Sequence, residues 1–176
     1  MQCFLLKGYA GTGKTSIVSA LVRAMHELEQ KTVLLAPTGR AAKVFSVYSG
    51  MEATSIHKKI YRQKSVSDFH FMLNHNKAKD TLFIVDEASM IGDSVAENNI
   101  FGSGRLLDDL IEYVYSGDNC RMILLGDTAQ LMPVGQNYSP ALDRKVLEKS
   151  ALDITEYTLT EVVRQASDSG ILANAT

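Results

Sequence analysis

The sequence predicts an α/β domain whose central, mostly parallel sheet is covered by helices on both faces. Short apolar runs of strand length alternate along the chain with longer segments in which apolar residues recur at helical spacing. The runs are almost continuously apolar, which is typical of parallel strands buried on both faces. Strands separated by helices in this way indicate a doubly covered sheet.

The expected strands are the apolar runs at 3–6, 32–36, 82–85 and 121–125 and a more alternating run at 154–160. Amphipathic segments predict helices at 13–30, 39–49, 105–115 and 140–149. Ser139 is the expected N-cap of the last helix, with Pro140 at its first position.

Two stretches interrupt this alternation. Residues 62–80 are polar, with a brief alternation at 68–73 and a turn-like NHN, which predicts a small hairpin insertion. Residues 92–104 are rich in Gly, Ser and Asn and are expected to form a mobile loop. We find no internal repeat and no linker, so residues 1–176 are expected to form a single domain.

The segment GYAGTGKT at 8–15 fits the pattern G-x-x-x-x-G-K-[ST], which is typical of a loop that binds nucleoside triphosphates. Its glycines let successive N–H groups point at one spot, and the helix that follows directs its dipole at the phosphates. A chance Gly-rich turn is disfavoured because the required strand and helix flank the loop. Lys14 is expected to reach the β- and γ-phosphates, and Thr15 to offer its hydroxyl to Mg²⁺. The expected nucleotide-binding residues are Gly8, Ala10, Gly11, Thr12, Gly13, Lys14, Thr15 and Ser16.

Two carboxylates follow the apolar run at 82–85. The run places Asp86 at the carboxyl end of a buried strand, the edge where open α/β sheets bind ligands. Asp86 is expected to hold Mg²⁺, directly or through water, and Glu87 to orient and deprotonate the attacking water. An acid pair at a strand end is often a solvated turn, but its position after a phosphate loop makes it more specific. A general base beside the metal carboxylate favours hydrolysis over kinase-type transfer.

Gln130 lies shortly after the apolar run at 121–125, three residues beyond Asp127. It is placed to hydrogen-bond the γ-phosphate or the attacking water, as a glutamine does in GTPases. The same pattern fits a strand-end turn equally well.

The composition, 45% hydrophobic and 22% charged, is ordinary for a soluble globular domain. The net charge of −2 gives no global sign of a nucleic-acid partner. Between residues 40 and 64, however, six basic residues accompany one acidic residue, Glu52, although a solvated helix face would also explain them. Cys3 and Cys120 lack metal-ligand spacing and are expected to be buried thiols in a reducing compartment. No signal peptide or membrane span is evident, so a cytoplasmic location is expected.

Six segments together resemble, in order, the motor motifs of superfamily 1 helicases. They are GYAGTGKTS, LLAPTGRAAK, TSIHKKIY, FIVDEASMI, GDTAQLMPVG and LTEVVRQ, and their wording is most similar to the RecD/Dda/TraI branch. The resemblance runs nearly end to end, with gaps at 62–80 and 92–104. It implies a RecA-like P-loop NTPase domain that binds ATP and Mg²⁺ and belongs to a 5′-to-3′ translocase on single-stranded DNA. The pathway (repair, recombination, conjugation or phage replication) stays open.

The resemblance also implies further site residues. Arg164 matches the family arginine that contacts the γ-phosphate, and joins Lys14, Glu87 and Gln130 as expected catalytic groups. The local basic surplus would supply phosphate contacts along a DNA strand. The residues expected to lie along single-stranded DNA are Pro37, Thr38, Gly39, Arg40, Thr54 and His57.

The polar stretch at 62–80 falls where this family inserts a small separation hairpin. Phe69, Phe71 and Met72 would then form either its apolar tip or its packing against the main domain.

By the same resemblance we expect the first motor lobe alone. The residues before Gly8 leave no room for the family's adenine-reading segment, and nothing after Ala175 supplies the motifs of a second lobe. We therefore expect little activity from this chain by itself. A self-contained P-loop ATPase or kinase and a non-catalytic interaction module remain alternatives. Salt-dependent binding of poly-dT would separate the helicase interpretation from both.

Overall fold

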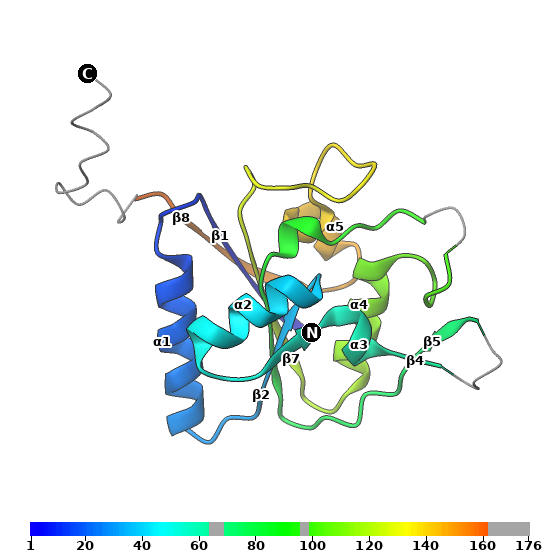
Figure 1. Cartoon of the computed structure of the whole chain (residues 1–176), viewed down its shortest axis with the longest axis horizontal. Coiled ribbons are helices and arrows are strands. Elements are labelled where there is room, and N and C mark those ends of the chain that lie inside the picture. Colours follow the sequence, from blue (N-terminus) through cyan, green and yellow to red (C-terminus); the bar gives the residue numbers. More distant parts are fainter. Residues whose placement is uncertain (64–68, 96–98, 162–176) are drawn as a thin grey trace.

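A six-stranded parallel sheet with helices on both faces forms the body of the protein (Figure 1). The computed structural model describes residues 1–63, 69–95 and 99–161. The strand order is β3-β2-β6-β7-β1-β8, and every pairing in this sheet is parallel. The α/β class with a mostly parallel central sheet is therefore confirmed.

Five of the six strands lie where the apolar runs predict them. The sixth, β3, was not predicted, because its three residues ATS are too few and too polar to show a strand pattern. It forms one edge of the sheet beside β2. The strands are β1 (Gln2–Gly8), β2 (Thr32–Ala36), β3 (Ala53–Ser55), β6 (Leu82–Val85), β7 (Arg121–Gly126) and β8 (Asp153–Leu159).

The helices include three close to their predicted positions: α1 (Lys14–Glu27), α2 (Gly39–Ser49) and α4 (Leu106–Ser116). A short helix, α3 (Ile56–Ile60), was not predicted, and η1 (Ala88–Met90) is a single 3₁₀ turn. Over the described ranges, no helix combines the length and the apolar character needed to cross a bilayer.

The helix predicted at 140–149 is divided in two, into a 3₁₀ turn, η2 (Pro140–Leu142), and α5 (Arg144–Glu148). Asp143 separates them and caps α5 by accepting a hydrogen bond from the Lys145 N–H at 2.8 Å. Ser139 precedes η2 without a side-chain capping bond, and its hydroxyl donates to the Ser89 carbonyl at 2.9 Å. Pro140 does occupy the first helical position.

Both faces of the sheet are buried. Successive side chains of a strand point to opposite faces, so Leu34 and Ile84 pack beneath α1 and α2, while their neighbours Leu35 and Val85 pack beneath α3 and α4. This two-sided burial explains why the strand sequences are continuously apolar rather than alternating. Both cysteines are free and buried, as predicted.

A separate antiparallel hairpin, β4 (Tyr61–Gln63) with β5 (Phe71–Leu73), projects from the body at the right of Figure 1. It lies where residues 62–80 predict an insertion. Of the two roles considered for its apolar residues, packing against the rest of the chain is seen for Phe71, and a place at the tip stays a prediction for Phe69 and Met72. Phe71 stacks on Phe101 with ring centroids 4.7 Å apart, whereas Phe69 and Met72 are 82% and 47% exposed.

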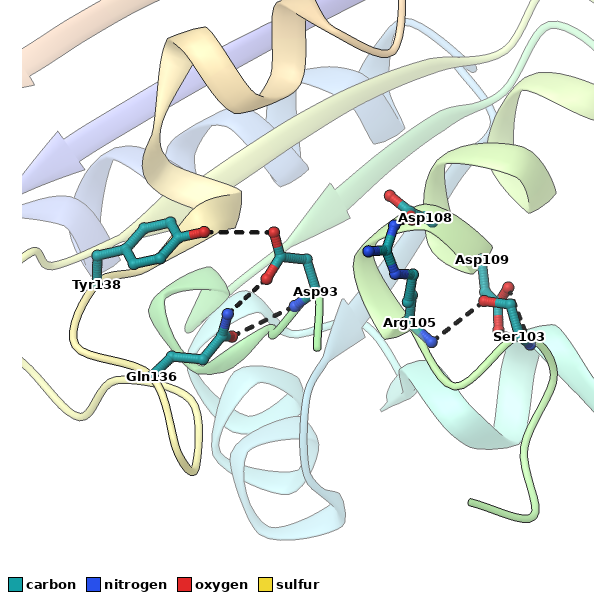
Figure 2. A network of polar contacts seen from close by, with 7 residues as sticks. All are labelled: Asp93, Ser103, Arg105, Asp108, Asp109, Gln136 and Tyr138. Carbon is teal, nitrogen blue, oxygen red and sulfur yellow. Dashed lines mark hydrogen bonds and ion pairs between the residues drawn. The ribbon is translucent and has the colours of Figure 1, made fainter. Parts of the chain in front are cut away.

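The segment expected to be a mobile loop, 92–104, makes several hydrogen bonds to neighbouring elements over its residues 100–103. The Phe71 N–H donates to the Ile100 carbonyl at 2.7 Å, and the Gly102 N–H donates back to the Phe71 carbonyl at 2.7 Å. The buried carboxylate of Asp109 accepts the Ser103 N–H at 3.0 Å (Figure 2) and the Tyr61 hydroxyl at 2.6 Å. These bonds join the hairpin and this segment to α4.

Candidate nucleotide-binding site

A pocket of about 360 Å³ lies at the carboxyl end of the sheet, where the central strands β1, β6 and β7 end. The parallel pairing brings these ends to the same end of the sheet: Lys7 lies opposite Gly126, the last residue of β7, and β6 ends slightly earlier, with Val85 opposite Leu124. Three separate stretches of sequence therefore meet in one pocket. Its lining consists of Tyr9, Ala10, Gly11, Gly13, Lys14, Thr15, Ser16, Asp86, Glu87 and Gln130.

The phosphate loop needs glycine for two distinct reasons. Gly11 and Gly13 have φ of 83° and 86°, the left-handed region that side chains disfavour. A Cβ at Gly8 would come 2.6 Å from the Thr12 hydroxyl oxygen. Thr12 is buried and donates to the Tyr9 carbonyl at 2.7 Å. Gly8 and Thr12 therefore shape the loop from behind and do not line the pocket, unlike the other predicted nucleotide-binding residues.

The start of α1 is suited to an anion. Its N-cap is Gly13, which supplies no side-chain cap, and its first turn holds no acidic residue. The first N–H groups of a helix lack partners within the helix and carry the positive end of its dipole. Helix α2 differs, because the Thr38 hydroxyl caps it by accepting the Ala41 N–H at 3.1 Å. The phosphates of a nucleotide thus fit the start of α1.

Lys14 is held at the pocket by three oxygen atoms. Its ammonium donates to the carbonyls of Gly8 and Tyr9, at 2.9 Å for Tyr9, and lies 3.7 Å from Asp127 Oδ2. Asp127 is buried and also accepts the Ala129 N–H at 2.8 Å. Asp127 was not among the predicted site residues. Its position directly after an apolar strand, the signal that identified Asp86, was sufficient to find it.

Asp86 and Glu87 lie beside each other on the pocket wall, in different environments. The Tyr48 hydroxyl donates to Asp86 Oδ2 at 2.5 Å. Glu87 has a φ of 53°, a strained conformation of the kind that gathers at functional sites. Burial, and then the nearby charge of Asp86, raise the pKa of Glu87, while Lys14 opposes the rise. A raised pKa suits a carboxylate that must accept a proton near neutral pH.

The residues expected to hold Mg²⁺, Thr15 and Asp86, both line the pocket. In the described part of the chain, no cluster of three or more His, Cys, Asp or Glu side chains could hold a metal by itself. The two oxygen donors Thr15 and Asp86 fit a hard cation that takes one or two protein oxygens and completes its shell with phosphate and water. They do not fit a structural zinc site.

The loop that carries Gln130 is hydrogen-bonded to Asp93, which follows Asp86 and Glu87 in the chain. Figure 2 shows Asp93 between Gln136 and Tyr138. The Gln136 amide donates to Asp93 Oδ1 at 2.5 Å and accepts the Asp93 N–H at 3.3 Å, and the Tyr138 hydroxyl lies 3.4 Å from Asp93 Oδ2. Near its other end, the Gln130 N–H donates to the Asp127 carbonyl at 3.2 Å. Gln130 therefore lies in a loop that begins with a tight turn and whose later residues, Gln136 and Tyr138, contact Asp93.

The residues predicted to lie along DNA are found at the same carboxyl end of the sheet, beside the pocket. Thr54 pairs with Leu35 at the ends of β3 and β2, directly before residues 37–40. Pro37 is buried, while Thr38, Gly39 and Arg40 are exposed at the start of α2. Within the described ranges, the exposed side chains of Arg40, Lys43 and Lys58 have no acidic partner.

His57 is half-buried and packs at the base of the hairpin, with its ring centroid 5.0 Å from Phe101 and 5.6 Å from Tyr61. Burial lowers the pKa of His57, so the ring is neutral at physiological pH. It contributes packing here, and its contact with DNA stays a prediction. Arg164, the last predicted catalytic group, lies outside the described residues.

Comparison with known proteins gives a consistent set of relatives. A family model described as an AAA domain matches residues 1–175. The ATP-dependent RecD2 DNA helicase of Deinococcus radiodurans is 33% identical over 172 residues, which cover 97% of this chain and 21% of that protein. The ATP-dependent DNA helicase dda of Enterobacteria phage T4 is 30% identical over 177 residues, which cover 90% and 34% respectively. The chain thus spans a fifth to a third of these relatives.

A solved structure has the same fold. The structure of Pif1 from a Bacteroides species, in complex with ADP-AlF4, matches 94% of this chain and 39% of its own length, with a TM-score of 0.57 at 20% identity. At that identity the likeness concerns the fold alone.

Replacing Glu87 by glutamine should stabilise the fold at neutral pH. Because burial raises the pKa of Glu87 above its usual 4.5, the folded state favours the protonated form, and stability falls as pH rises from that value through the folded pKa. A neutral glutamine escapes this loss. Thermal unfolding should therefore give a higher Tm for Glu87→Gln than for the unmodified chain at pH 8, with the difference closing near pH 4.

The exposed Glu112→Gln is the matched control and should change Tm little at either pH. A Glu87→Gln variant that is less stable at pH 8, or equally shifted at both pH values, would show that Glu87 is not destabilised by its surroundings.

Proposed function

We propose that this chain, which belongs to the AAA domain family and is a RecA-like domain of the superfamily 1 helicase type, is the nucleotide-hydrolysing motor lobe of an ATP-dependent DNA helicase. The observation that carries the proposal is the meeting of Lys14, Asp86, Glu87 and Gln130 in one pocket, against an uncapped helix start. This set combines an anion site, a metal carboxylate and a general base, which are the groups that hydrolysis of a triphosphate requires.

In this proposal each group has one task. The first-turn N–H groups of α1 and the Lys14 ammonium hold the β- and γ-phosphates. Thr15 and Asp86 hold Mg²⁺, which neutralises charge on the phosphate oxygens. Glu87 accepts a proton from the attacking water, and Gln130 orients that water or the γ-phosphate. We assign Arg164 to the γ-phosphate from the motif resemblance.

We further propose that single-stranded DNA lies along the neighbouring edge, over the ends of β2 and β3 and the start of α2. The unpaired cations Arg40, Lys43 and Lys58 support this, because phosphate contacts need exposed charge without an internal partner. Such contacts bind a strand without reading its sequence. Movement in the 5′-to-3′ direction is proposed from the motif resemblance. The proposed strand-binding residues are Pro37, Thr38, Gly39, Arg40, Thr54 and His57.

Lys14→Ala tests the nucleotide site. The lysine reaches phosphate and not the nucleoside, so the variant should bind ATP about 10- to 100-fold more weakly, from about 1.5–3 kcal/mol per charged hydrogen bond. Binding of adenosine should not change. Isothermal titration calorimetry measures both. Lys77→Ala, an exposed change away from the pocket, should bind both ligands normally. Equal losses for ATP and adenosine would contradict the assignment.

Arg40→Ala tests the strand path. Removing one phosphate contact should weaken binding to all single strands alike, and should lower the slope of log affinity against log salt by about 0.7, the value for a single strand. Fluorescence anisotropy with labelled poly-dT at several salt concentrations measures the slope. Arg121→Ala is the matched control, because Arg121 is the first residue of β7 and lies at the opposite, amino-terminal end of the strands. An unchanged slope in Arg40→Ala would remove this residue from the path.

We expect these 176 residues, tested on their own, to hydrolyse ATP near the background rate, with or without DNA, and not to unwind a duplex. The pocket lining comes from one lobe, whereas an arginine supplied from outside is typically worth about 10³–10⁵ in rate. Phosphate release by this chain, alone and fused to a second RecA-like lobe, measures the difference. The fusion should restore DNA-stimulated hydrolysis, and Glu87→Gln should abolish it. Fast DNA-stimulated turnover by the chain alone, lost in Glu87→Gln, would be the contrary result.

A further inference from the structure

We infer that Tyr48 is a positioning residue for Asp86, holding one carboxylate oxygen so that the other is presented to Mg²⁺. The inference rests on the proposed nucleotide function and deepens it, because it concerns how the chain orients the metal carboxylate. Tyr48 belongs to none of the motif positions assigned above, and it acts through Asp86 rather than on the nucleotide.

The two carboxylate oxygens of Asp86 differ in their hydrogen bonding. The Tyr48 hydroxyl donates to Oδ2 at 2.5 Å. Within the described part of the chain, Oδ1 accepts no hydrogen bond. An ionised carboxylate can accept from several directions, so a donor on one oxygen leaves the other free for a metal ion or its bound water. Hydrogen bonds of this kind to ligating carboxylates orient them and tune their affinity for the metal.

Tyr48 is itself held firmly. Its ring stacks on the fully buried Phe45, with centroids 5.1 Å apart and planes 25° from parallel. Its backbone carbonyl accepts the Ser19 hydroxyl of α1 at 2.6 Å. Helix α1 starts at the phosphate loop, so one residue of α2 is tied both to the helix that begins at Lys14 and to the carboxylate after β6. A hydroxyl held this way can fix Asp86, which a mobile surface tyrosine could not do.

A purely structural role predicts a different outcome from a positioning role. If the ring matters only for packing on Phe45, phenylalanine would serve as well as tyrosine. If the hydroxyl positions Asp86, its removal affects steps that depend on Mg²⁺ and spares those that do not. Tyr48→Phe keeps the ring and removes only the hydroxyl, so it separates the two roles.

The experiment titrates Mg²⁺ into the full chain with a fluorescent ATP analogue (mant-ATP), alongside a series in EDTA. Tyr48→Phe should raise the Mg²⁺ midpoint about 10- to 100-fold, the usual effect of losing an outer partner of a metal ligand. Its affinity for mant-ATP in EDTA should equal that of the unmodified chain. Ser19→Ala, which loosens Tyr48 without touching Asp86, should raise the midpoint by less in the same direction.

Tyr61→Phe is the matched control, because it also removes a tyrosine hydroxyl from an aspartate, Asp109, but does so at the hairpin. It should leave the Mg²⁺ midpoint unchanged. An unchanged midpoint in Tyr48→Phe overturns the inference, and so does an equal loss with and without Mg²⁺. An unmodified chain that binds no mant-ATP in Mg²⁺ overturns the proposed function as well, whereas normal binding with an unaffected variant overturns this inference alone.

Discussion

The parallel pairing of β1, β7 and β6 is the constraint on which the rest of the site depends. Because these strands run in the same direction and end within a few residues of one another, the three loops that follow them leave the sheet at its carboxyl end. Lys14, Asp86 and Gln130 then meet without any direct contact having to bring them together. A shift of one residue in this register would turn each strand's side chains toward the opposite face, so the fit of these side chains to the helices on each face helps to fix the geometry of the pocket.

The two helices that start at this end of the sheet differ in how their first turns are capped, and the difference matches their proposed ligands. Helix α1 has no side-chain cap and no acidic residue in its first turn, which suits a multiply charged phosphate chain. Helix α2 is capped by its own Thr38 and carries an exposed Arg40, which suits contacts with the phosphates of a DNA strand.

At the pocket, Glu87 lowers the stability of the fold in two ways. Its backbone is in the left-handed region, and its pKa is raised because its charged form is disfavoured there. Such costs are expected where a residue is selected for its chemistry rather than for stability.

The sequence predicted what depends on short-range pattern. Continuous apolar runs located β2 and β6 to the residue, and polar groups at or shortly after strand ends predicted Asp86, Glu87 and Gln130, which line one pocket. The contacts that fix these groups join residues far apart in the chain: 38 positions for Tyr48 and Asp86, and 43 for Asp93 and Gln136. No local periodicity encodes such pairs. The hydrogen bonds that residues 99–104 make to the hairpin and to α4 were not predicted for the same reason, whereas the break in the predicted last helix comes at Asp143, which caps α5 through a local bond.

The position of a divalent ion tests the shared pocket most directly. Crystals of the chain grown with Mn²⁺ in place of Mg²⁺, together with a non-hydrolysable ATP analogue, would locate the ion by its anomalous scattering. We expect one strong peak between Thr15 and Asp86, directly coordinated or bridged by water, with the phosphates against the start of α1. An ion bound elsewhere, or a triphosphate held away from residues 8–15, would contradict the assignment of this pocket.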